Sequence, residues 1–284
     1  MNLDAVKDYK VLVIGDFITD EYHYVRVVGK AIKESALSCM VSASRRGESF
    51  SGGTWAAAAH VRALCAVVDT GVGYREMVTK RIIEDVYFRK LIVVHEDRGN
   101  CTVWEEGHID GKDFGAYDLV IVCDFGHGTM KKEVIAKVSK EARFLAVNAQ
   151  TNATNFGFNL ITKYPRADLV VIDEMEARLA AHDNTSQIED VILALGFKKI
   201  IVTLGMNGAI GFDGAFERAK ALTNKAVDTM GAGDAFLAVT APFACAGFTM
   251  RDLLRIGNAA GAIKIGNIGQ KAITKEELKA KLNG

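Results

Sequence analysis

Several features that would mark other classes of protein are missing from this chain. Its five cysteines (39, 65, 101, 123 and 245) are odd in number and form no C-x-x-C pair, which argues for free thiols in a reducing compartment. Lys plus Arg and Asp plus Glu balance at 35 each, so no basic field attracts nucleic acid or an anionic membrane. No apolar run approaches the ~20 residues that span a bilayer, and the first ten residues lack a signal-peptide core. We therefore expect a cytoplasmic protein that binds neither nucleic acid nor membrane.

What the chain does contain is a regular alternation of apolar segments. At 284 residues, with 49% hydrophobic and 25% charged residues, it suits one large α/β domain. We expect strands at Lys10–Gly15, Asp118–Cys123, Phe144–Val147, Asp168–Ile172 and Lys199–Leu204. We expect helices at Thr54–Leu64, Met130–Glu141, Glu174–Ala181, Ile188–Leu195, Ala235–Ala246, Met250–Ile265 and Lys275–Leu282. This order predicts a mostly parallel sheet with helices on both faces.

Two stretches break the alternation. Glu21–Ser44 and Lys80–Trp104 are richer in Val, Ile, Tyr and Phe, in a pattern typical of half-exposed strands. Together they predict a small antiparallel sheet that stands off the main domain and covers the carboxyl ends of the parallel strands, where open α/β folds bind ligands. Such a lid would expose an apolar face, and we expect a homodimer that buries it.

The most informative segment is Asp-Thr-Met-Gly-Ala-Gly-Asp at 228–234, directly before an apolar helical run. Amide groups at a helix start, freed from side-chain bulk by Gly231 and Gly233, form an anion site. A carboxylate there would repel a phosphate, unless Asp234 takes a proton from an alcohol that attacks a phosphoryl group held by the amides. The alternative is a glycine-rich helix start in which Asp234 is only a cap.

Further polar and glycine residues follow the first expected strand. Asp16 and Asp20 lie where sugar hydroxyls could be bound, or they are solvated acids of a strand–loop junction. Gly52 and Gly53 form a loop that a ligand could approach closely, or a capped turn.

The ends of later strands carry weaker signals of the same kind. Thr203, Gly205 and Gly208 could present backbone to a nucleotide, or form a tight hairpin. Asp173 and Glu176 could organise magnesium and its waters, or form a helix N-cap box. The six histidines have no metal-ligand spacing.

Taken together, these segments resemble the ribokinase-like (PfkB) carbohydrate kinases from about Lys10 to the C-terminal helix. Residues 228–234 match that family's D-T-x-G-A-G-D signature. Supporting segments are Gly15-Asp16…Asp20, Gly52-Gly53, Asp124-Phe-Gly-His-Gly, the turn from Thr203 to Gly208 and Asn258-Ala-Ala-Gly. Within the family, Gly15–Tyr22, Asp124–Gly128 and the run from Val147 to Asp168 are most similar to heptose-phosphate kinase domains fused to sugar nucleotidyltransferases.

The resemblance implies a single three-layer α/β/α domain over 1–284, with lid segments at about 21–44 and 80–104, that uses ATP and Mg²⁺. It implies that Asp234 is the base and that the amides of Gly231, Ala232 and Gly233 stabilise the transferring phosphoryl group. Asp16, Asp20, Gly52 and Gly53 would hold the sugar. Thr203, Gly205, Gly208 and Asn258 would line the ATP site, and Glu176 with Asp173 would act through magnesium. The implied substrate is a sugar or sugar phosphate, first a heptose 7-phosphate, with a functional link to a sugar nucleotidyltransferase.

Three departures from the family pattern keep a second hypothesis open. The family's Asn-x-x-Glu appears as Asp173-x-x-Glu176, Thr54 replaces an Asn after the glycine pair, and the chain between Leu64 and Lys80 is short, as if a strand–helix unit were missing. A catalytically impaired member that binds nucleotide or sugar, or acts as a scaffold, is therefore the alternative. A nicotinamide-dependent oxidoreductase is disfavoured because the first strand ends in Gly-Asp-Phe-Ile-Thr and not in the dinucleotide glycine fingerprint.

Overall fold

A computed structural model describes residues 1–34, 38–43, 47–100, 108–223 and 225–283. Its strands are β1 Lys10–Lys30, β2 Ser38–Ser42, β3 Glu48–Gly52, β4 Val67–Glu84, β5 Arg89–Asn100, β6 Leu119–Asp124, β7 Leu145–Ala149, β8 Leu169–Asp173, β9 Ile200–Thr203, β10 Ala209–Phe212 and β11 Phe216–Ala219. Its α-helices are α1 Gly53–Arg62, α2 Lys132–Glu141, α3 Glu174–Ala181, α4 Ile188–Leu195, α5 Ala232–Cys245, α6 Met250–Ile265 and α7 Lys275–Asn283. Short 3₁₀ turns lie at Leu3–Val6, Phe114–Ala116, Ile161–Lys163 and Gly205–Asn207. Every strand and helix expected from the apolar pattern is present. The first strand, expected at Lys10–Gly15, continues to Lys30, and the other elements differ only by a few residues at their ends.

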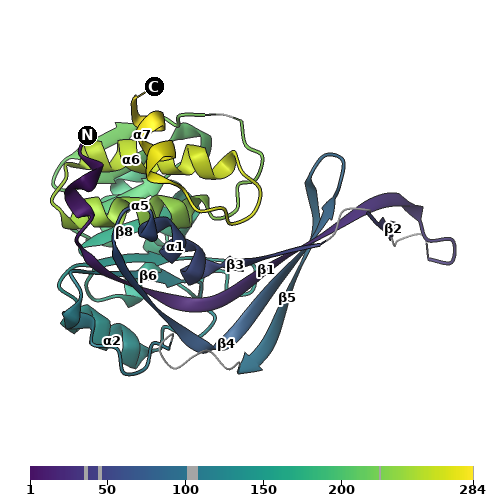
Figure 1. Cartoon of the computed structure of the whole chain (residues 1–284), viewed down its shortest axis with the longest axis horizontal. Coiled ribbons are helices and arrows are strands. Elements are labelled where there is room, and N and C mark those ends of the chain that lie inside the picture. The colour runs from purple at the N-terminus through teal and green to yellow at the C-terminus, as the bar shows by residue number, and fades with distance from the viewer. Residues whose placement is uncertain (35–37, 44–46, 101–107, 224, 284) are drawn as a thin grey trace.

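The domain has three layers, with the sheet between two groups of helices (Figure 1). Alternate residues of each central strand point to opposite faces, as the two-residue period of a strand requires. Val11 and Val13 pack in a cluster with α1, α5, α6 and α7, whereas Leu12 and Ile14 pack in a cluster with α2, α3 and α4. The predicted α/β/α architecture is therefore confirmed. No helix in the described ranges is long and apolar enough to cross a membrane.

The sheet order is β11-β10-β9-β8-β7-β6-β1-β4-β5, and the strands from β9 to β4 in this order are parallel. Parallel neighbours bring their carboxyl ends to one edge of the sheet. β6 ends at Asp124, β8 at Asp173 and β9 at Thr203, so residues far apart in sequence meet there. This edge is where a ligand site is expected in such a sheet.

The lid differs from the expected separate antiparallel sheet. β1 and β4 stay parallel neighbours from the core out to the pair Val25–Glu84, so the lid is a continuation of the central sheet. β2 and β3 add to β1 antiparallel, and β5 adds to β4 antiparallel. Figure 1 shows this sheet leaving the body as a long arm. Of the expected lid segments, residues 35–37, 44 and 101–104 lie outside the described residues.

The short stretch between Leu64 and Lys80 is occupied by most of β4. Sequence patterning missed it because Gly71 and Gly73 interrupt its apolar run. Both glycines are needed for close packing: a Cβ at Gly71 would lie 3.1 Å from Ile14 Cγ2, and one at Gly73 would lie 2.3 Å from Thr129 Oγ1. The chain thus passes from α1 directly into β4 and on into the lid. Whether a strand–helix unit is missing here relative to the family stays a prediction.

Candidate active site

A cleft of about 790 Å³ lies at the carboxyl edge of the sheet, between the lid and the start of α5. It brings together most of the residues singled out in the sequence. Those that line it are Asp20, Gly53, Asp173, Glu176, Thr203, Gly205, Gly208, Gly231, Ala232, Gly233, Asp234 and Asn258. Asp16 and Gly52 do not line it.

Asp234 lies in the first turn of α5, and only 6% of its surface is exposed. The helix starts here because Gly231 adopts φ +71°, a left-handed conformation that glycine accepts readily, and the apolar run from Ala235 follows. Gln150 Nε2 donates a hydrogen bond to Asp234 Oδ1 at 2.6 Å. Burial raises the pKa of Asp234 to about 7, although the bond from Gln150 opposes the rise. A carboxylate with this pKa can accept and release a proton near neutral pH.

Next to Asp234, backbone N–H groups at the start of α5 lack strong hydrogen-bond acceptors among the described residues. Ala232 N–H reaches Thr229 O only at 3.4 Å, and the N–H groups of Gly233 and Asp234 meet no acceptor among the described residues. Unpaired donors at a helix start, together with the helix dipole, attract an anion. The site therefore pairs an anion cradle with a group able to take a proton.

Asp20 lies at the opposite, lid side of the cleft and is 5% exposed. Its Oδ1 forms an ion pair with Arg81 on β4, and its Oδ2 accepts a hydrogen bond from Gln270 Nε2 at 3.1 Å. A Cβ at Gly52 would lie 2.7 Å from Asp20 Oδ2, so the glycine pair lets this loop approach the carboxylate. Gly52 thus acts through Asp20, whereas Gly53 faces the cleft itself.

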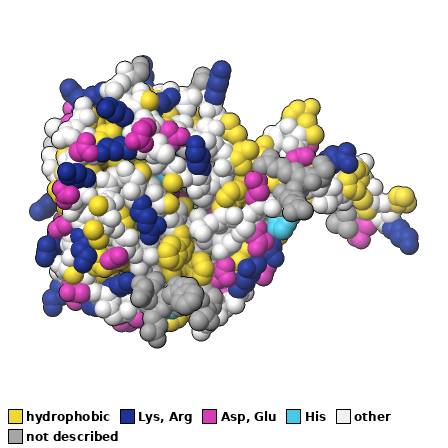
Figure 2. Space-filling view, viewed as in Figure 1, with side chains coloured by type: hydrophobic (Ala, Val, Ile, Leu, Met, Phe, Trp, Pro, Cys, Tyr) yellow, Lys and Arg dark blue, Asp and Glu magenta, His cyan; other side chains and the backbone are white. Residues whose placement is uncertain are grey.

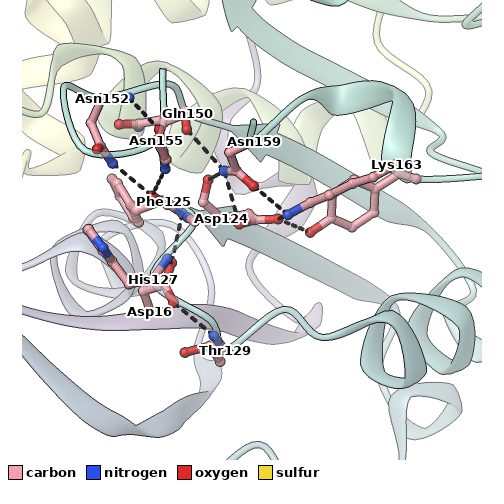
Figure 3. Close-up of polar contacts among 12 residues, drawn as sticks. Asp16, Asp124, Phe125, His127, Thr129, Gln150, Asn152, Asn155, Asn159 and Lys163 are labelled. Carbon is pink, nitrogen blue, oxygen red and sulfur yellow. Dashed lines mark hydrogen bonds and ion pairs between the residues drawn. The ribbon is translucent and has the colours of Figure 1, made fainter. Parts of the chain in front are cut away.

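Asp16 has a different position from the one expected for a sugar ligand. It is 1% exposed, and its carboxylate accepts hydrogen bonds from the backbone N–H groups of Phe125 (2.9 Å), His127 (3.2 Å) and Thr129 (3.2 Å). Figure 3 shows Asp16 beneath this loop, which the side-chain amides of Asn152 and Asn155 hold from the other side through the Phe125 carbonyl. Asp16 shapes the segment Asp124–Gly128 and leaves Asp20 as the acid that faces the cleft.

Three buried polar atoms that line the cleft have no hydrogen-bond partner within the described ranges. They are Asn148 Oδ1, Thr151 Oγ1 and Gln270 Oε1. Buried polar atoms are almost always paired in folded proteins, so unpaired ones in a cleft indicate a hydroxyl-bearing or amine-bearing ligand. All three residues are part of the lining of the cleft that also contains Asp20 and Asp234.

Asp173 and Glu176 form the capping box of α3, which was the alternative to a magnesium role. Asp173 Oδ1 accepts from Glu176 N at 2.7 Å, and Glu176 Oε2 accepts from Asp173 N at 2.9 Å. The other oxygen, Glu176 Oε1, accepts from Thr151 N at 3.0 Å. Burial, and next the charge of Asp173, raise the pKa of Glu176. The described part of the chain contains no group of three or more His, Cys, Asp or Glu residues arranged to hold a metal.

The residues expected around a nucleotide line the far end of the cleft. Gly205 (φ +57°) is open to the cleft, with nothing within 4 Å of the position that a Cβ would take, whereas a Cβ at Gly208 would lie 2.0 Å from Ala219 O. Asn258 Nδ2 holds the same β11 end through the carbonyls of Ala219 (3.2 Å) and Lys220 (3.0 Å). Apolar side chains complete this end of the cleft, among them Met206, Leu222, Ala226 and Ile265. A flat apolar group with polar edges fits such surroundings.

Among the residues that sequence reasoning missed are Gln150, Arg81 and Lys264, in addition to Asn148, Thr151 and Gln270. Gln150 and Arg81 have ordinary strand-end and strand positions, and nothing local marks them as partners of Asp234 and Asp20. Lys264 lies in the apolar helix α6. A charged residue between the apolar residues Ala262, Ile263 and Ile265 was the feature of the sequence that could have marked it as buried.

Comparison with known proteins agrees with this geometry. Residues 79–277 match the pfkB family carbohydrate kinases. The chain is 25% identical over 304 residues to the D-beta-D-heptose 7-phosphate kinase of Bordetella bronchiseptica, with 95% of each chain covered. It is 28% identical over 173 residues to the bifunctional protein HldE of Hyphomonas neptunium, a match that covers 58% of this chain and only 35% of that relative. The match thus spans about a third of the length of the bifunctional relatives.

Solved structures share the fold at lower identity. The ribokinase of Thermotoga maritima superposes with a TM-score of 0.73 at 18% identity, covering 97% of this chain and 100% of the other. The Arabidopsis thaliana ribokinase complexed with ribose and ATP gives a TM-score of 0.70 at 17% identity, covering 98% and 99%. The family match covers more than half of the chain and agrees with the Asp228–Asp234 segment and the fold around it. This chain therefore belongs to the pfkB family of carbohydrate kinases.

Proposed function

We propose that this chain transfers the γ-phosphoryl group of ATP to a hydroxyl of a sugar or sugar phosphate, with Asp234 as the general base. One observation carries the proposal: a buried carboxylate whose pKa is raised to about 7 stands beside unpaired amides at the start of α5. An acid there is out of place in a simple phosphate site, and it fits a site where an alcohol loses its proton next to a phosphoryl group.

In the proposed mechanism the acceptor hydroxyl donates its proton to Asp234. Gln150 holds Oδ1, and no described residue donates a hydrogen bond to Oδ2, which leaves that oxygen for the substrate. The amides of Gly231, Ala232 and Gly233 stabilise the charge that develops on the transferring group, because fixed donors need no rearrangement as the charge forms. Closure of the lid over the cleft would exclude water that competes with the sugar.

The sugar would lie between Asp20 and Asp234, in contact with the unpaired atoms of Asn148 and Gln270. Arg81, His95 and His127 line the same end of the cleft. Their nitrogen atoms would complement a phosphate on the substrate, and the relative from Bordetella bronchiseptica is named as a heptose 7-phosphate kinase. A heptose 7-phosphate is therefore our first candidate substrate.

ATP would occupy the far end of the cleft, with its base near Met206 and Leu222 and its phosphates toward the start of α5. Glu176 does not fit direct coordination of Mg²⁺, because both of its carboxylate oxygens already accept backbone amides, and Asp173 uses Oδ1 in the capping box. Their position at the cleft fits contact with the waters of a nucleotide-bound ion, since Mg²⁺ keeps several waters and relies on substrate phosphates. When bound, the ion would neutralise phosphate charge.

The test is ADP release from purified protein with ATP, Mg²⁺ and a panel of sugars and sugar phosphates that includes heptose 7-phosphates. Asp234→Asn should lower turnover at least about 10³-fold while ATP binding by calorimetry stays within about threefold. Asp213→Asn, an exposed acid in the turn between β10 and β11, is the matched control. Equal turnover of Asp234→Asn and the wild type would refute the mechanism. Binding of ATP or sugar without turnover by the wild type would favour the impaired, ligand-binding alternative.

A homodimer through the lid belongs to the same proposal. Leu91, Ile92, Val93 and Val94 of the edge strand β5 are each 37% to 48% exposed, and hydrophobic side chains gather along the arm in Figure 2. A run of this kind on an edge strand is a site for pairing with another chain. Light scattering should give twice the chain mass for the wild type and a single chain mass for Ile92→Lys.

We also propose that the product feeds a sugar nucleotidyltransferase, as the resemblance to the fused kinase domains implies.

A further inference from the structure

Lys264 is a lysine buried inside the domain, with 1% of its surface exposed. It lies in the last turn of α6, and its ammonium group donates hydrogen bonds to two backbone carbonyls, Met230 O at 2.6 Å and Gly269 O at 2.7 Å. Met230 belongs to the turn directly before α5, and Gly269 belongs to the loop between α6 and α7. One side chain thus ties two loops that border the cleft.

The same two residues are held from their other end by Asp228. Its Oδ1 accepts from Met230 N at 3.1 Å, and its Oδ2 accepts from Gly269 N at 3.2 Å. An acid therefore holds both N–H groups and a lysine holds both carbonyls. The positions of Met230 and Gly269 are fixed from both sides, and each is followed directly by a cleft residue, Gly231 and Gln270.

The contacts continue into the site itself. A Cβ at Gly231 would lie 3.3 Å from Lys264 Cε and 2.8 Å from Gln270 Oε1, so Gly231 packs directly on the lysine stem. Gln270 in turn donates to Asp20 at the lid side of the cleft. Lys264 therefore lies behind both the anion cradle and the residue that holds Asp20.

Burial of this charge is poorly explained by stability alone. Removing an ammonium group from water is costly, and well-packed apolar side chains often stabilise such positions as well or better. Burial lowers the pKa of Lys264, while the charges of Asp228 and then Asp234 favour its charged form. The charge also acts on Asp234, whose pKa it lowers against the larger effect of burial.

We propose that Lys264 is a positioning residue for phosphoryl transfer, an internal cation that fixes the Met230–Gly231 turn so that the amides of α5 point at the transferring group. This inference rests on the proposed function. It assigns Lys264 no contact with substrate: the lysine acts through the carbonyls of Met230 and Gly269.

The experiment compares Lys264→Met, which keeps the stem and removes the charge, with Lys264→Ala, which leaves space for a small cation. Lys271→Met is the control, because that lysine is exposed and pairs only with Glu277 among the described residues. We expect kcat to fall about 10²-fold in Lys264→Met, in the range seen when a fixed oxyanion donor is lost, with KM for ATP and sugar within about threefold. Ammonium chloride should restore at least about a tenth of the lost kcat in Lys264→Ala, since two carbonyl oxygens that hold a lysine ammonium can hold a free one.

A second readout requires no turnover. Hydrogen exchange of the peptide that covers residues 229–236 should become at least about tenfold faster in Lys264→Met, and ammonium should slow it again in Lys264→Ala. A kcat within threefold of the wild type, or a loss of kcat that follows the folded fraction and ignores ammonium, would overturn the proposal. If the wild type phosphorylates no sugar, the proposed function fails, and unchanged exchange at 229–236 would then overturn the positioning role independently.

Discussion

Lys90 on the lid strand β5 forms an ion pair of 2.7 Å with Asp228, whose side chain is fully buried ahead of α5. Tyr22 of β1 donates to the other oxygen of the same carboxylate at 2.8 Å. Two strands of the lid, β1 and β5, are thus attached to the segment directly before α5. Although burial opposes it, the hydrogen bonds from Lys90 and Tyr22 lower the pKa of Asp228. The charge of Asp228 is therefore present at neutral pH and links the two parts.

The first prediction concerns this link. Tyr22→Phe removes one donor to a buried charge, and the free energy of unfolding should fall by about 1.5 to 3 kcal/mol, the usual range for hydrogen bonds to charged groups. Urea unfolding followed by circular dichroism measures it. Tyr87→Phe is the control, because Tyr87 is 72% exposed and its loss of hydroxyl should change the free energy by less than about 0.5 kcal/mol. Equal unfolding midpoints for the two variants would contradict a stabilising role for the Tyr22–Asp228 bond.

The second prediction concerns pH and turnover. Asp234 must be ionised to accept a proton, and burial raises its pKa to about 7. The value of kcat/KM should therefore be level above that pH and fall about tenfold per unit below it. The groups that act on this carboxylate are Gln150, Asp20 and Lys264. Because the Gln150 hydrogen bond lowers the pKa, Gln150→Leu should move the inflection to higher pH. A profile that is flat between pH 5.5 and 8.5, or an inflection that Gln150→Leu leaves in place, would speak against Asp234 as the base.

The third prediction follows from the same shift in the pKa of Asp234. The folded-state pKa lies above the ordinary value of 3.8, so the unfolded chain ionises more readily and ionisation opposes folding. This unfavourable contribution is absent below pH 3.8, grows between pH 3.8 and about 7, and is complete above that. Asp234→Asn should therefore raise the free energy of unfolding at pH 8, by roughly 2 to 4 kcal/mol, and by much less at pH 4.5. Guanidinium unfolding at both pH values measures it. If Asp234→Asn were less stable than the wild type at pH 8, ionisation of the buried Asp234 would not lower the free energy of unfolding, and the prediction would be wrong.

Local patterns in the sequence were enough to place much of this fold. The helix start at α5 follows from two glycines and an apolar run within ten residues, and each central strand is an apolar segment that alternates between two faces. The pairing of β1 with β4 depends on contacts between residues more than 50 positions apart, so the expected antiparallel pairing of the two lid segments was wrong. The first part of β4 was not predicted as a strand, because Gly71 and Gly73 interrupt its apolar run; in the structure the two glycines admit Ile14 and Thr129.

The site residues also divide into those that a local sequence pattern reveals and those whose contacts form only in the folded chain. The position of Asp234 at the cleft could be predicted, because the glycine-rich helix start that carries this acid is visible within seven residues. Lys264 could not, because its partners Met230 and Gly269 are backbone carbonyls that no side-chain pattern reveals. Asp16 and Asp20 have the same chemistry four residues apart, and only the fold decides which carboxylate meets the loop and which meets the cleft.

The last prediction separates Asp16 from Asp20 by experiment. Asp16→Asn replaces one acceptor oxygen with an amide that faces the N–H groups of the loop from Phe125 to Thr129. A buried donor left against donors costs about 2 to 4 kcal/mol, so the free energy of unfolding should fall by that amount. The remaining folded enzyme should keep its KM for the sugar within about twofold. Asp20→Asn should instead raise that KM at least about tenfold, because Asp20 faces the cleft and Arg81 would lose its counter-charge. Kinetics at 10 °C, normalised to the folded fraction, distinguish the two variants. If the KM for the sugar rises as much in Asp16→Asn as in Asp20→Asn, Asp16 must contact the substrate and its assignment to the loop is wrong.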